Sequence, residues 1–160
     1  MTKIAHIEAR SVRIPLVRPV MLGTMTIAQR DYVIVRLTLS DGSQGYAYGY
    51  DRGLPLFELV VKAAQSYLGE SSADRNRLRK LALGPTPAPR AAMTRGMSLC
   101  DIALWDAWCV SIGQPLWRVL GAVRDRVPVM PVIGYGMTPD KAASEGADLA
   151  ARGFRTIKCM

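Results

Sequence analysis

Residues 127–160 have the hydrophobic pattern of a single β–α–β unit. Val127 to Tyr135 is an almost continuous apolar run, which is typical of a strand buried on both faces of a parallel sheet. Thr138-Pro139-Asp140 combines an N-cap residue, a proline and an early acid, and predicts a helix that ends at Arg152-Gly153. Residues 154–160 alternate as a second strand. Two parallel strands alone leave an apolar edge uncovered, so we expect the sequence to be the front part of something larger.

Length and composition bound what the chain can be. Its 160 residues are too few for a complete eight-stranded β/α barrel, which needs about 250. With 49% apolar and 21% charged residues, the chain can bury a core. Charges interrupt the first twenty positions and the apolar runs are short, so we expect neither a membrane span nor a secretory signal, and a cytoplasmic location.

The net charge of +8 would suit an anionic partner. Basic residues are nevertheless scattered along the chain, with one modest concentration at residues 75–80, and no aromatic or glycine-rich RNA-binding pattern accompanies them. A solvated helix face explains that concentration more simply, and we expect no nucleic-acid partner.

The front of the chain changes from a period of two to a helical period. Alternation predicts strands over residues 3–14, with a bulge near Arg10-Ser11, and over 33–39 and 45–50. Apolar spacing then predicts helices over 56–69, 71–84 and 90–112 and a short turn at 115–121, with a stiff proline connector at 85–89. In the second helix Leu78 and Leu81 are expected on the buried side. The third strand places tyrosines on one face and leaves the other flat enough for close approach by another backbone or a ligand.

Lys158 is the most informative polar residue of the last strand. Alternation places it with Met160 on one face and Cys159 on the other. If the helix covers the Cys159 face, Lys158 points into a barrel interior near the carboxyl end of its strand, where barrel enzymes place catalytic groups. A lysine that extends into solvent at a strand end explains the spacing equally well.

Two segments carry a resemblance to a known family. The motif Cys100-Asp-Ile-Ala-Leu-Trp-Asp106, followed by Ile112-Gly-Gln-Pro-Leu-Trp-Arg-Val-Leu-Gly121, resembles the mandelate racemase and muconate-lactonizing branch of the enolase superfamily. Gly153-Phe-Arg-Thr-Ile-Lys158 resembles the approach to its Lys-x-Lys motif. The resemblance implies an α+β capping domain over residues 1–125, with a three-stranded antiparallel meander plus helices. Residues 126–160 would form the first β–α–β unit of a modified β/α barrel, so the chain is expected to be truncated.

The resemblance also implies a reaction. Family members abstract the proton α to a carboxylate and hold the enediolate with Mg²⁺, whose carboxylate ligands come from later strands and are not expected in this chain. Lys158 matches the first lysine, which polarises the substrate carboxylate. Met160 occupies the position of the second lysine, the usual base, and a thioether cannot take a proton. We therefore expect a dehydratase or another one-base lyase rather than a racemase, with a non-catalytic structural or interaction module as the alternative.

Substrate contacts are expected from loops. By resemblance, the connections at 18–28 and 48–53 close over the barrel mouth, and the turn after the first barrel strand lines the pocket floor. The residues expected to bind substrate are Val20, Thr24, Ile27, Tyr48, Arg52 and Tyr135. Ordinary surface composition explains these loops equally well without the family.

The remaining polar residues are expected to be structural. Asp101 and Asp106 lie in the middle of a predicted helix, where hydrogen bonding to backbone or arginines is a better explanation than catalysis. His6, the only histidine, is expected to be structural or exposed. We expect a small carboxylic acid as the substrate and a homo-oligomeric protein.

Overall fold

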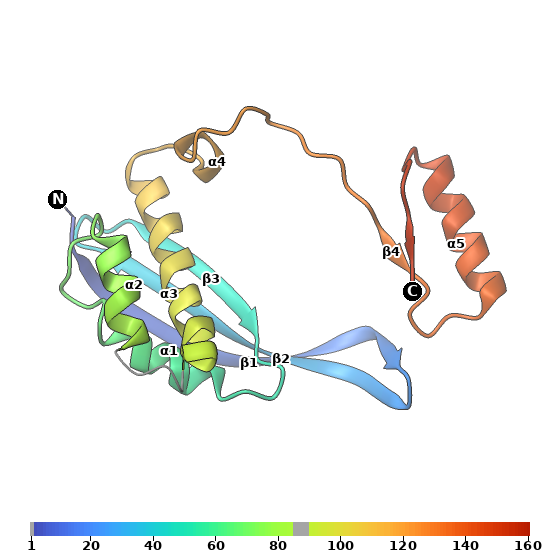
Figure 1. Cartoon of the computed structure of the whole chain (residues 1–160), viewed down its shortest axis with the longest axis horizontal. Helices are drawn as coiled ribbons and strands as arrows, with labels where there is room; N and C mark the ends of the chain where they lie inside the picture. The colour runs from blue at the N-terminus through green and yellow to red at the C-terminus, as the bar shows by residue number, and fades with distance from the viewer. Residues whose placement is uncertain (1, 85–89) are drawn as a thin grey trace. The chain divides into compact units, whose positions relative to one another are not determined.

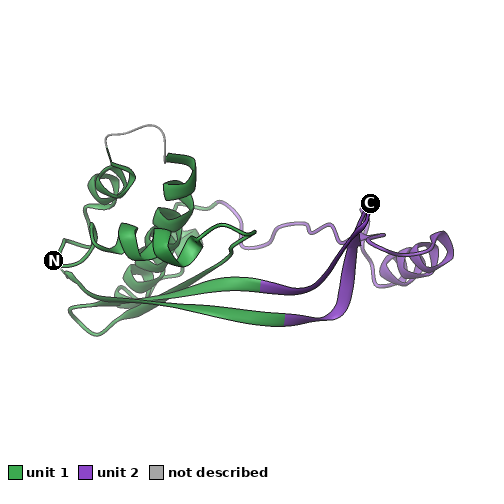
Figure 2. Cartoon of the chain, turned by 90° about the horizontal axis from the view of Figure 1, so that it is seen from below, with its two compact units in different colours: residues 1–14, 31–122 green, residues 15–30, 123–160 purple. Residues whose placement is uncertain are grey.

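The computed structural model describes residues 2–84 and 90–160. The proline connector expected at 85–89 lies outside the described residues. By its internal contacts the chain divides into two compact units, residues 1–14 with 31–122 and residues 15–30 with 123–160 (Figure 2). The predicted boundary at 125/126 divides the chain once, whereas here residues 15–30 group with the later segment. The division into two family domains at 125/126 stays a prediction.

The first unit is built on a three-stranded sheet in the order β1-β2-β3. Its strands are β1 (Ile4–Leu22), β2 (Met25–Leu39) and β3 (Gln44–Tyr50). β2 and β3 pair antiparallel, with Val35 opposite Ala47. A tight turn at Asp41-Gly42 joins the two strands: Gly42 has φ 85°, and its N–H donates to the Leu39 carbonyl at 2.9 Å.

Three helices cover one face of this sheet (Figure 1). They are α1 (Leu56–Ala64), α2 (Arg75–Leu83) and α3 (Arg90–Ser111), and a short α4 (Leu116–Val119) follows. The core between the layers is apolar because alternate strand residues and one stripe of each helix face it. Among its members are Val33, Val35, Leu37, Leu56, Val60, Leu78, Cys100 and Leu104. Leu81, predicted to be buried, is 48% exposed; Ala82 takes the buried position because it lies one turn beyond Leu78.

The second unit contains β4 (Val132–Ile133), α5 (Pro139–Ala151) and β5 (Lys158–Cys159). β4 and β5 pair in parallel, so the predicted β–α–β order is confirmed. The predicted lengths and burial are wrong, because Val127 and Val129 are 69% and 66% exposed and lie outside any strand. The short β5 pairs with only two residues, and nothing else in the described chain extends the sheet.

The segment expected to be a loop at 18–28 is regular structure. β1 continues to Leu22 and β2 begins at Met25, so only Gly23 and Thr24 form the turn, and Gly23 has φ 60°. A tight turn with a left-handed glycine is the usual connection of a β-hairpin. The prediction of a loop at 18–28 is therefore wrong, because residues with strand-forming side chains continue β1 and β2 on both sides of the turn.

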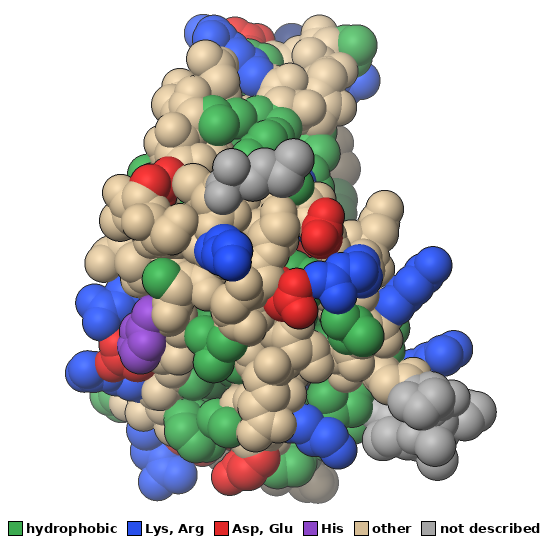
Figure 3. All heavy atoms as spheres, turned by 90° about the vertical axis from the view of Figure 1, so that its left-hand side faces the viewer, with side chains coloured by type: hydrophobic (Ala, Val, Ile, Leu, Met, Phe, Trp, Pro, Cys, Tyr) green, Lys and Arg blue, Asp and Glu red, His purple; other side chains and the backbone are tan. Residues whose placement is uncertain are grey.

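Surface charge follows the predicted scatter. On the face in Figure 3, Lys and Arg side chains stand apart, several of them beside Asp or Glu, and do not merge into one basic patch. None of the described helices is long and apolar enough to cross a bilayer.

Candidate functional site

Tyrosines gather where β2 and β3 meet the loop at residues 51–55. Tyr50 pairs with Tyr32 across the two strands, and their ring centroids lie 5.7 Å apart. The Tyr48 ring meets Tyr32 edge-on at 6.1 Å, and Tyr48 is 74% exposed. We call Tyr32, Tyr48 and Tyr50 the tyrosine cluster. It offers phenol groups to solvent on the sheet face away from the helices.

Arg52 extends this cluster. Its guanidinium carbon lies 6.0 Å from the centre of the Tyr50 ring, within range of a cation–π contact. Its backbone is left-handed, with φ 54°, which is unfavourable for a side chain with a Cβ. The turn around it is held locally: the Gly53 N–H donates to the Asp51 carboxylate at 3.0 Å, and the Leu54 N–H to the Asp51 carbonyl at 3.1 Å.

A hollow of about 360 Å³ opens beside the cluster. Its lining residues are Ser11, Val12, Arg13, Asp31, Tyr32 and Asp51. Arg13 donates two hydrogen bonds to the Asp31 carboxylate, at 2.7 and 3.3 Å. The hydrogen bond from Arg13 lowers the pKa of Asp31, against a small opposing effect of desolvation. The hollow thus presents a fixed ion pair next to an aromatic wall.

This hollow is not predicted by the sequence. The predicted strands end at Ile14 and begin at Val33, so they give no indication that Arg13 and Asp31 lie side by side. A single long hairpin centred on Gly23-Thr24 brings them together. The signal available was the strand-forming composition on both sides of that glycine.

Lys158 and Met160 lie in the second unit. The Lys158 N–H donates to the Pro131 carbonyl at 2.9 Å, and the Met160 N–H to the Ile133 carbonyl at 3.0 Å, as in a parallel ladder. Ile133 is buried, and its Cδ1 lies 3.6 Å from the place of a Cβ on Gly146 of α5. Since Ile133 is opposite Cys159, the Cys159 face is turned to α5. Lys158 lies on the other face, as alternation predicts, and its side chain is exposed.

The hairpin tip touches the turn that follows β4. Gly134 and Gly136, on either side of Tyr135, have φ 98° and 62°. A Cβ on Gly136 would lie 3.2 Å from the Cβ of Met21. Tyr135 is 40% exposed. The structure therefore brings the hairpin tip and the carboxyl end of β4 together within one unit.

The predicted substrate residues fall into two groups. Tyr48 and Arg52 belong to the first unit. The second unit holds Val20, Thr24, Ile27, Tyr135 and Lys158. Val20 and Ile27 are half-buried in the hairpin, and Thr24 is exposed in its turn. Each group is assembled by its own unit, and their roles in binding stay predictions.

Asp106 is hydrogen-bonded as expected, whereas the prediction is wrong for Asp101, whose buried Oδ1 has no hydrogen-bond partner among the described residues. The Asp106 carboxylate accepts a hydrogen bond from the Tyr46 N–H of β3 at 2.8 Å, as expected for a structural acid. Burial raises the pKa of Asp101, an effect that Arg79 and Arg75 oppose. The Arg75 guanidinium packs against the rings of both Trp105 and Trp108, 4.0 and 4.2 Å from the ring centres.

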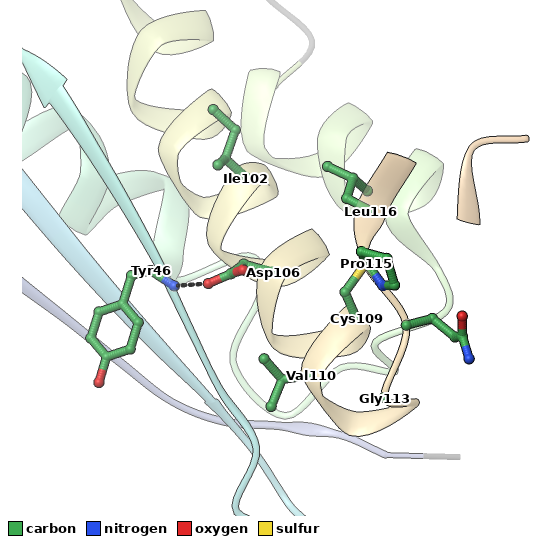
Figure 4. Close-up of a pocket in the computed structure, with 9 residues that line it drawn as sticks. Tyr46, Ile102, Asp106, Cys109, Val110, Gly113, Pro115 and Leu116 are labelled. Atoms are coloured by element: carbon green, nitrogen blue, oxygen red, sulfur yellow. Dashed lines mark hydrogen bonds between the residues drawn. The ribbon is translucent and has the colours of Figure 1, made fainter. Parts of the chain in front are cut away.

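A second hollow, of about 550 Å³, lies between the end of α3 and α4 (Figure 4). Its walls include Ile102, Val110 and Leu116, and its polar groups are few. Asp106 on its rim is already bound to Tyr46, and desolvation raises the pKa of the Cys109 thiol. The arrangement offers no activated nucleophile and no acid–base pair.

Metal ligands are also lacking in this part of the protein. Within residues 2–84 and 90–160, no three His, Cys, Asp or Glu side chains come together in a way that could hold a metal ion. The residues present therefore do not fit a magnesium site by themselves.

Comparison with protein families gives one family. Residues 5–121 match the family described as "Mandelate racemase / muconate lactonizing enzyme, N-terminal domain". The match covers the sheet and the helices of the first unit.

Curated relatives include epimerases and dehydratases. The chain is 27% identical to the L-Ala-D/L-Glu epimerase of Bacillus subtilis, over 98% of this chain and 43% of the relative. It is 30% identical to the L-Lys-D/L-Arg epimerase of Methylococcus capsulatus, over 98% of this chain and 45% of the relative. With the D-gluconate dehydratase of Thermoproteus tenax it shares 32% identity, over 79% of this chain and 27% of the relative. The chain spans less than half the length of these relatives.

Solved structures share the fold. The substrate complex of the Bacillus subtilis L-Ala-D/L-Glu epimerase superposes with a TM-score of 0.81 at 23% identity, over 98% of this chain and 45% of that one. An enolase from Bradyrhizobium, complexed with magnesium and mandelic acid, gives 0.80 at 23% identity, over 99% and 45%. These likenesses show the fold, and the family match shows the ancestry. The chain therefore belongs to the mandelate racemase and muconate-lactonizing branch of the enolase superfamily, and its residues 5–121 are the N-terminal capping domain of that branch.

Proposed function

We propose that the protein containing these 160 residues abstracts the proton α to a carboxylate of a hydroxy or sugar acid, and that it is a dehydratase rather than a racemase. The observation that carries the proposal is the pair formed by Lys158 of β5 and Met160, the residue directly after that strand, which alternation places on the same face. The relatives include both racemising and dehydrating enzymes, so the choice between the two reactions depends on this chain's own residues.

Lys158 supplies a positive charge at this face. An exposed ammonium at the end of a strand can donate hydrogen bonds to a carboxylate oxygen and stabilise charge that develops there when the α-proton leaves. Two residues further on, the Met160 thioether can neither accept nor donate that proton. Lys158 therefore binds the substrate on this face, and the position two residues further on supplies no acid–base group.

Dehydration is compatible with one base. A base on the opposite face takes the α-proton, the electron pair forms the enediolate, and the β-hydroxyl leaves as water after protonation, giving an enol that becomes a 2-keto acid. Racemisation instead requires a proton to be delivered on the face that Met160 occupies. The base is proposed to come from a part of the protein outside these residues.

The loop groups supply substrate recognition in this proposal. Tyr48 and Arg52 present a phenol and a guanidinium, which suit the hydroxyls and a second carboxylate of an acid sugar. Val20, Thr24, Ile27 and Tyr135 offer a mixed apolar and hydroxyl surface at the hairpin tip and the end of β4. Both groups are mostly exposed in the described chain and available to a ligand.

Magnesium enters only as part of the whole protein. Solved relatives are described with bound magnesium, among them a talarate/galactarate dehydratase with L-glucarate. Since the described residues offer no ligand cluster, any such site must take its carboxylates from outside this chain. We also propose, from the sequence alone, a cytoplasmic homo-oligomer.

A non-catalytic role is the second candidate, and Met160 also favours it. If the missing lysine reflects loss of catalysis, the unit keeps its packing surfaces and acts as a structural or interaction module. The two candidates differ in whether the α-proton of any acid exchanges.

The test uses the protein that contains this chain, with Mg²⁺ and a panel of acid sugars and dipeptides in D₂O. NMR follows α-proton exchange, and a carbonyl reagent detects 2-keto acid. We expect 2-keto acid without inverted substrate from the wild type. We expect Lys158→Met to lower the rate by about 10²-fold or more, as for loss of a charge-stabilising donor. Inversion without keto acid would overturn the dehydratase assignment, and no exchange at all would favour the module.

A Met160→Lys variant gives a second test, with Met160→Leu as its matched control. It places an amine two residues from Lys158 on the same face, and the two ammonium groups lower each other's pKa, so one can act as a base. Proton transfer by a positioned group contributes about 10²–10⁴-fold. We therefore expect this variant, and not Met160→Leu, to gain measurable α-proton exchange with inversion.

A further inference from the structure

Close backbone approaches hold helix α3 against the sheet at Gly45 and against helix α1 at Gly96. A Cβ on Gly45 of β3 would lie 2.1 Å from the Ala107 nitrogen and 2.2 Å from the Ala103 carbonyl oxygen. A Cβ on Gly96 of α3 would lie 2.5 Å from the backbone of Leu59 in α1. Backbone contacts of this kind cannot be relieved by side-chain motion. The helix therefore has a fixed place on the sheet.

From this helix, two charged side chains reach β3. At the start of the strand, the Asp106 carboxylate accepts the Tyr46 N–H. At its end, the half-buried Arg95 donates one hydrogen bond to the Tyr50 carbonyl and another, at 2.9 Å, to the Asp51 carbonyl. β3 is the edge strand of the sheet, so these side chains satisfy backbone groups that no further strand pairs.

The Arg95 contacts fall where the strand gives way to the loop at 51–55. Arg52, the residue after Asp51, has a left-handed backbone conformation, and its guanidinium lies over the Tyr50 ring. A non-glycine residue in this conformation persists only where its neighbours fix the chain. Arg95 fixes both carbonyls that precede it, so the direction in which Arg52 leaves the strand depends on that guanidinium.

We infer that Arg95 is a positioning residue: by clamping the carbonyls of Tyr50 and Asp51 to α3, it sets the place of Arg52 and so the affinity of this loop for the substrate carboxylate or hydroxyls. The inference rests on the proposed function for the identity of the ligand. It concerns a residue on the buried side of the loop, which does not itself touch the ligand.

The role differs from general support of the fold. The close approach at Gly45 holds α3 on the sheet without Arg95, the approach at Gly96 holds it against α1, and Asp106 holds the other end of β3. Loss of Arg95 therefore loosens the loop and leaves the helix in place. A merely structural residue would instead affect the helix and the loop together.

The experiment compares Arg95→Met and Arg95→Lys in the protein containing this chain. Methionine keeps much of the side-chain length and removes both donors, whereas lysine keeps a charged donor that can reach one carbonyl. Arg90→Met is the control, because it removes the same charge from an exposed position in the first turn of α3. Hydrogen exchange followed by mass spectrometry reports on residues 51–55 and on α3.

We expect Arg95→Met to speed exchange in residues 51–55 by about tenfold or more, as for loss of charge-assisted hydrogen bonds, and to leave residues 99–104 unchanged. Arg95→Lys should give an intermediate effect, and Arg90→Met none. Equal exchange in Arg95→Met and Arg90→Met would overturn the inference.

Kinetics supply the second readout. With an acid that the wild type turns over, Arg95→Met should raise KM by about tenfold and leave kcat within about twofold, since uniform binding is lost. Faster loop exchange with an unchanged KM would reduce Arg95 to a structural tie and overturn the inference. If the wild type turns over no acid, the proposed function fails, and the exchange experiment alone decides whether Arg95 fixes the loop.

Discussion

Single glycines decide how closely the layers of the first unit approach. A Cβ at Gly45 would meet backbone atoms of α3, whereas a Cβ at Gly49 would meet flexible side chains, Leu99 at 3.1 and 3.2 Å and Leu56 at 3.4 Å. The two positions belong to the same strand and the same face. They therefore separate a rigid contact from a compliant one.

We predict that Gly45→Ala destabilises the fold by on the order of 3 kcal/mol, because overpacking against backbone must displace α3. Gly49→Ala should cost less, about 1 kcal/mol or below, since a leucine can change rotamer. Urea unfolding followed by circular dichroism measures both. Equal costs would mean that α3 yields as easily as a side chain does.

Asp101 illustrates a different residue-scale effect. Burial raises its pKa above the ordinary value of 3.8. The folded protein thus carries a penalty for the charged carboxylate at neutral pH, and the penalty disappears as the pH falls through the raised pKa towards 3.8, because the folded state then binds the proton first.

We predict that Asp101→Asn raises the melting temperature at pH 7 by about 2–4 °C, the shift expected for roughly 1 kcal/mol in a protein of this size. The gain should stay constant at pH values above the raised pKa and shrink as the pH falls through that pKa towards 3.8. Melting curves at several pH values provide the test, with Asp125→Asn as the exposed control. A gain that grows in acid would show that Asp101 stabilises the fold as an ion.

At the scale of elements, α3 serves as the cover of the β3 edge. The Asp106 carboxylate accepts a backbone hydrogen bond that a neighbouring strand would otherwise accept. Asp106→Ala should destabilise the chain by about 1–2 kcal/mol, because the Tyr46 N–H loses its partner. Asp106→Asn keeps a carbonyl oxygen in the same place and should cost less than half as much. Unfolding free energies of the two variants in urea distinguish the hydrogen bond from the charge, and equal losses would exclude the hydrogen bond as the cause.

The elements differ in how far sequence alone predicted them. The sequence predicts α3 and α5 closely, because a glycine follows the end of each helix. For α1 the start is as predicted, but the helix ends at Ala64 and not at Gly69. The hairpin over β1 and β2 was missed beyond Ile14 because its two faces are both mostly exposed, and alternation carries no signal there. Val127 was expected in a buried strand, but an apolar run predicts burial only when the partners that bury it are present.

For the whole molecule, the second unit exposes a large amount of apolar surface. Val17 is fully exposed, Val123 is 92% exposed, and Val127 and Val129 are more than half exposed. Surfaces of this kind mark sites of association. The 160-residue chain by itself is therefore expected to self-associate and to bind a hydrophobic dye.

Light scattering coupled to size exclusion measures this association. Changing Val123, Val127 and Val129 together to serine should reduce the average mass of the chain and its dye fluorescence. Changing the exposed residues Asn76, Lys80 and Gln114 of the first unit together to alanine is the comparison, and it should leave both quantities unchanged. A monomeric wild type that binds no dye would contradict the expectation.

The candidate site was predictable only in part for a reason that concerns the whole chain. Lys158 could be assigned to a face by alternation, because two residues suffice to define it. The tyrosine cluster could not be completed, since Tyr32 reaches Tyr48 and Tyr50 through strand pairing rather than through spacing along the chain. The role of Arg95 could not be predicted for the same reason, because its hydrogen-bond partners lie more than forty positions away in the sequence.

The hairpin that crosses from one unit to the other limits how such proteins can be recombined. Residues 15–30 group with the later segment although they are encoded far ahead of it. A chimaera joined between residues 122 and 123 would thus pair the later segment with a foreign tip. Grafting residues 15–30 together with the later segment keeps the native contacts. Met21 and Gly136 must therefore be transferred together.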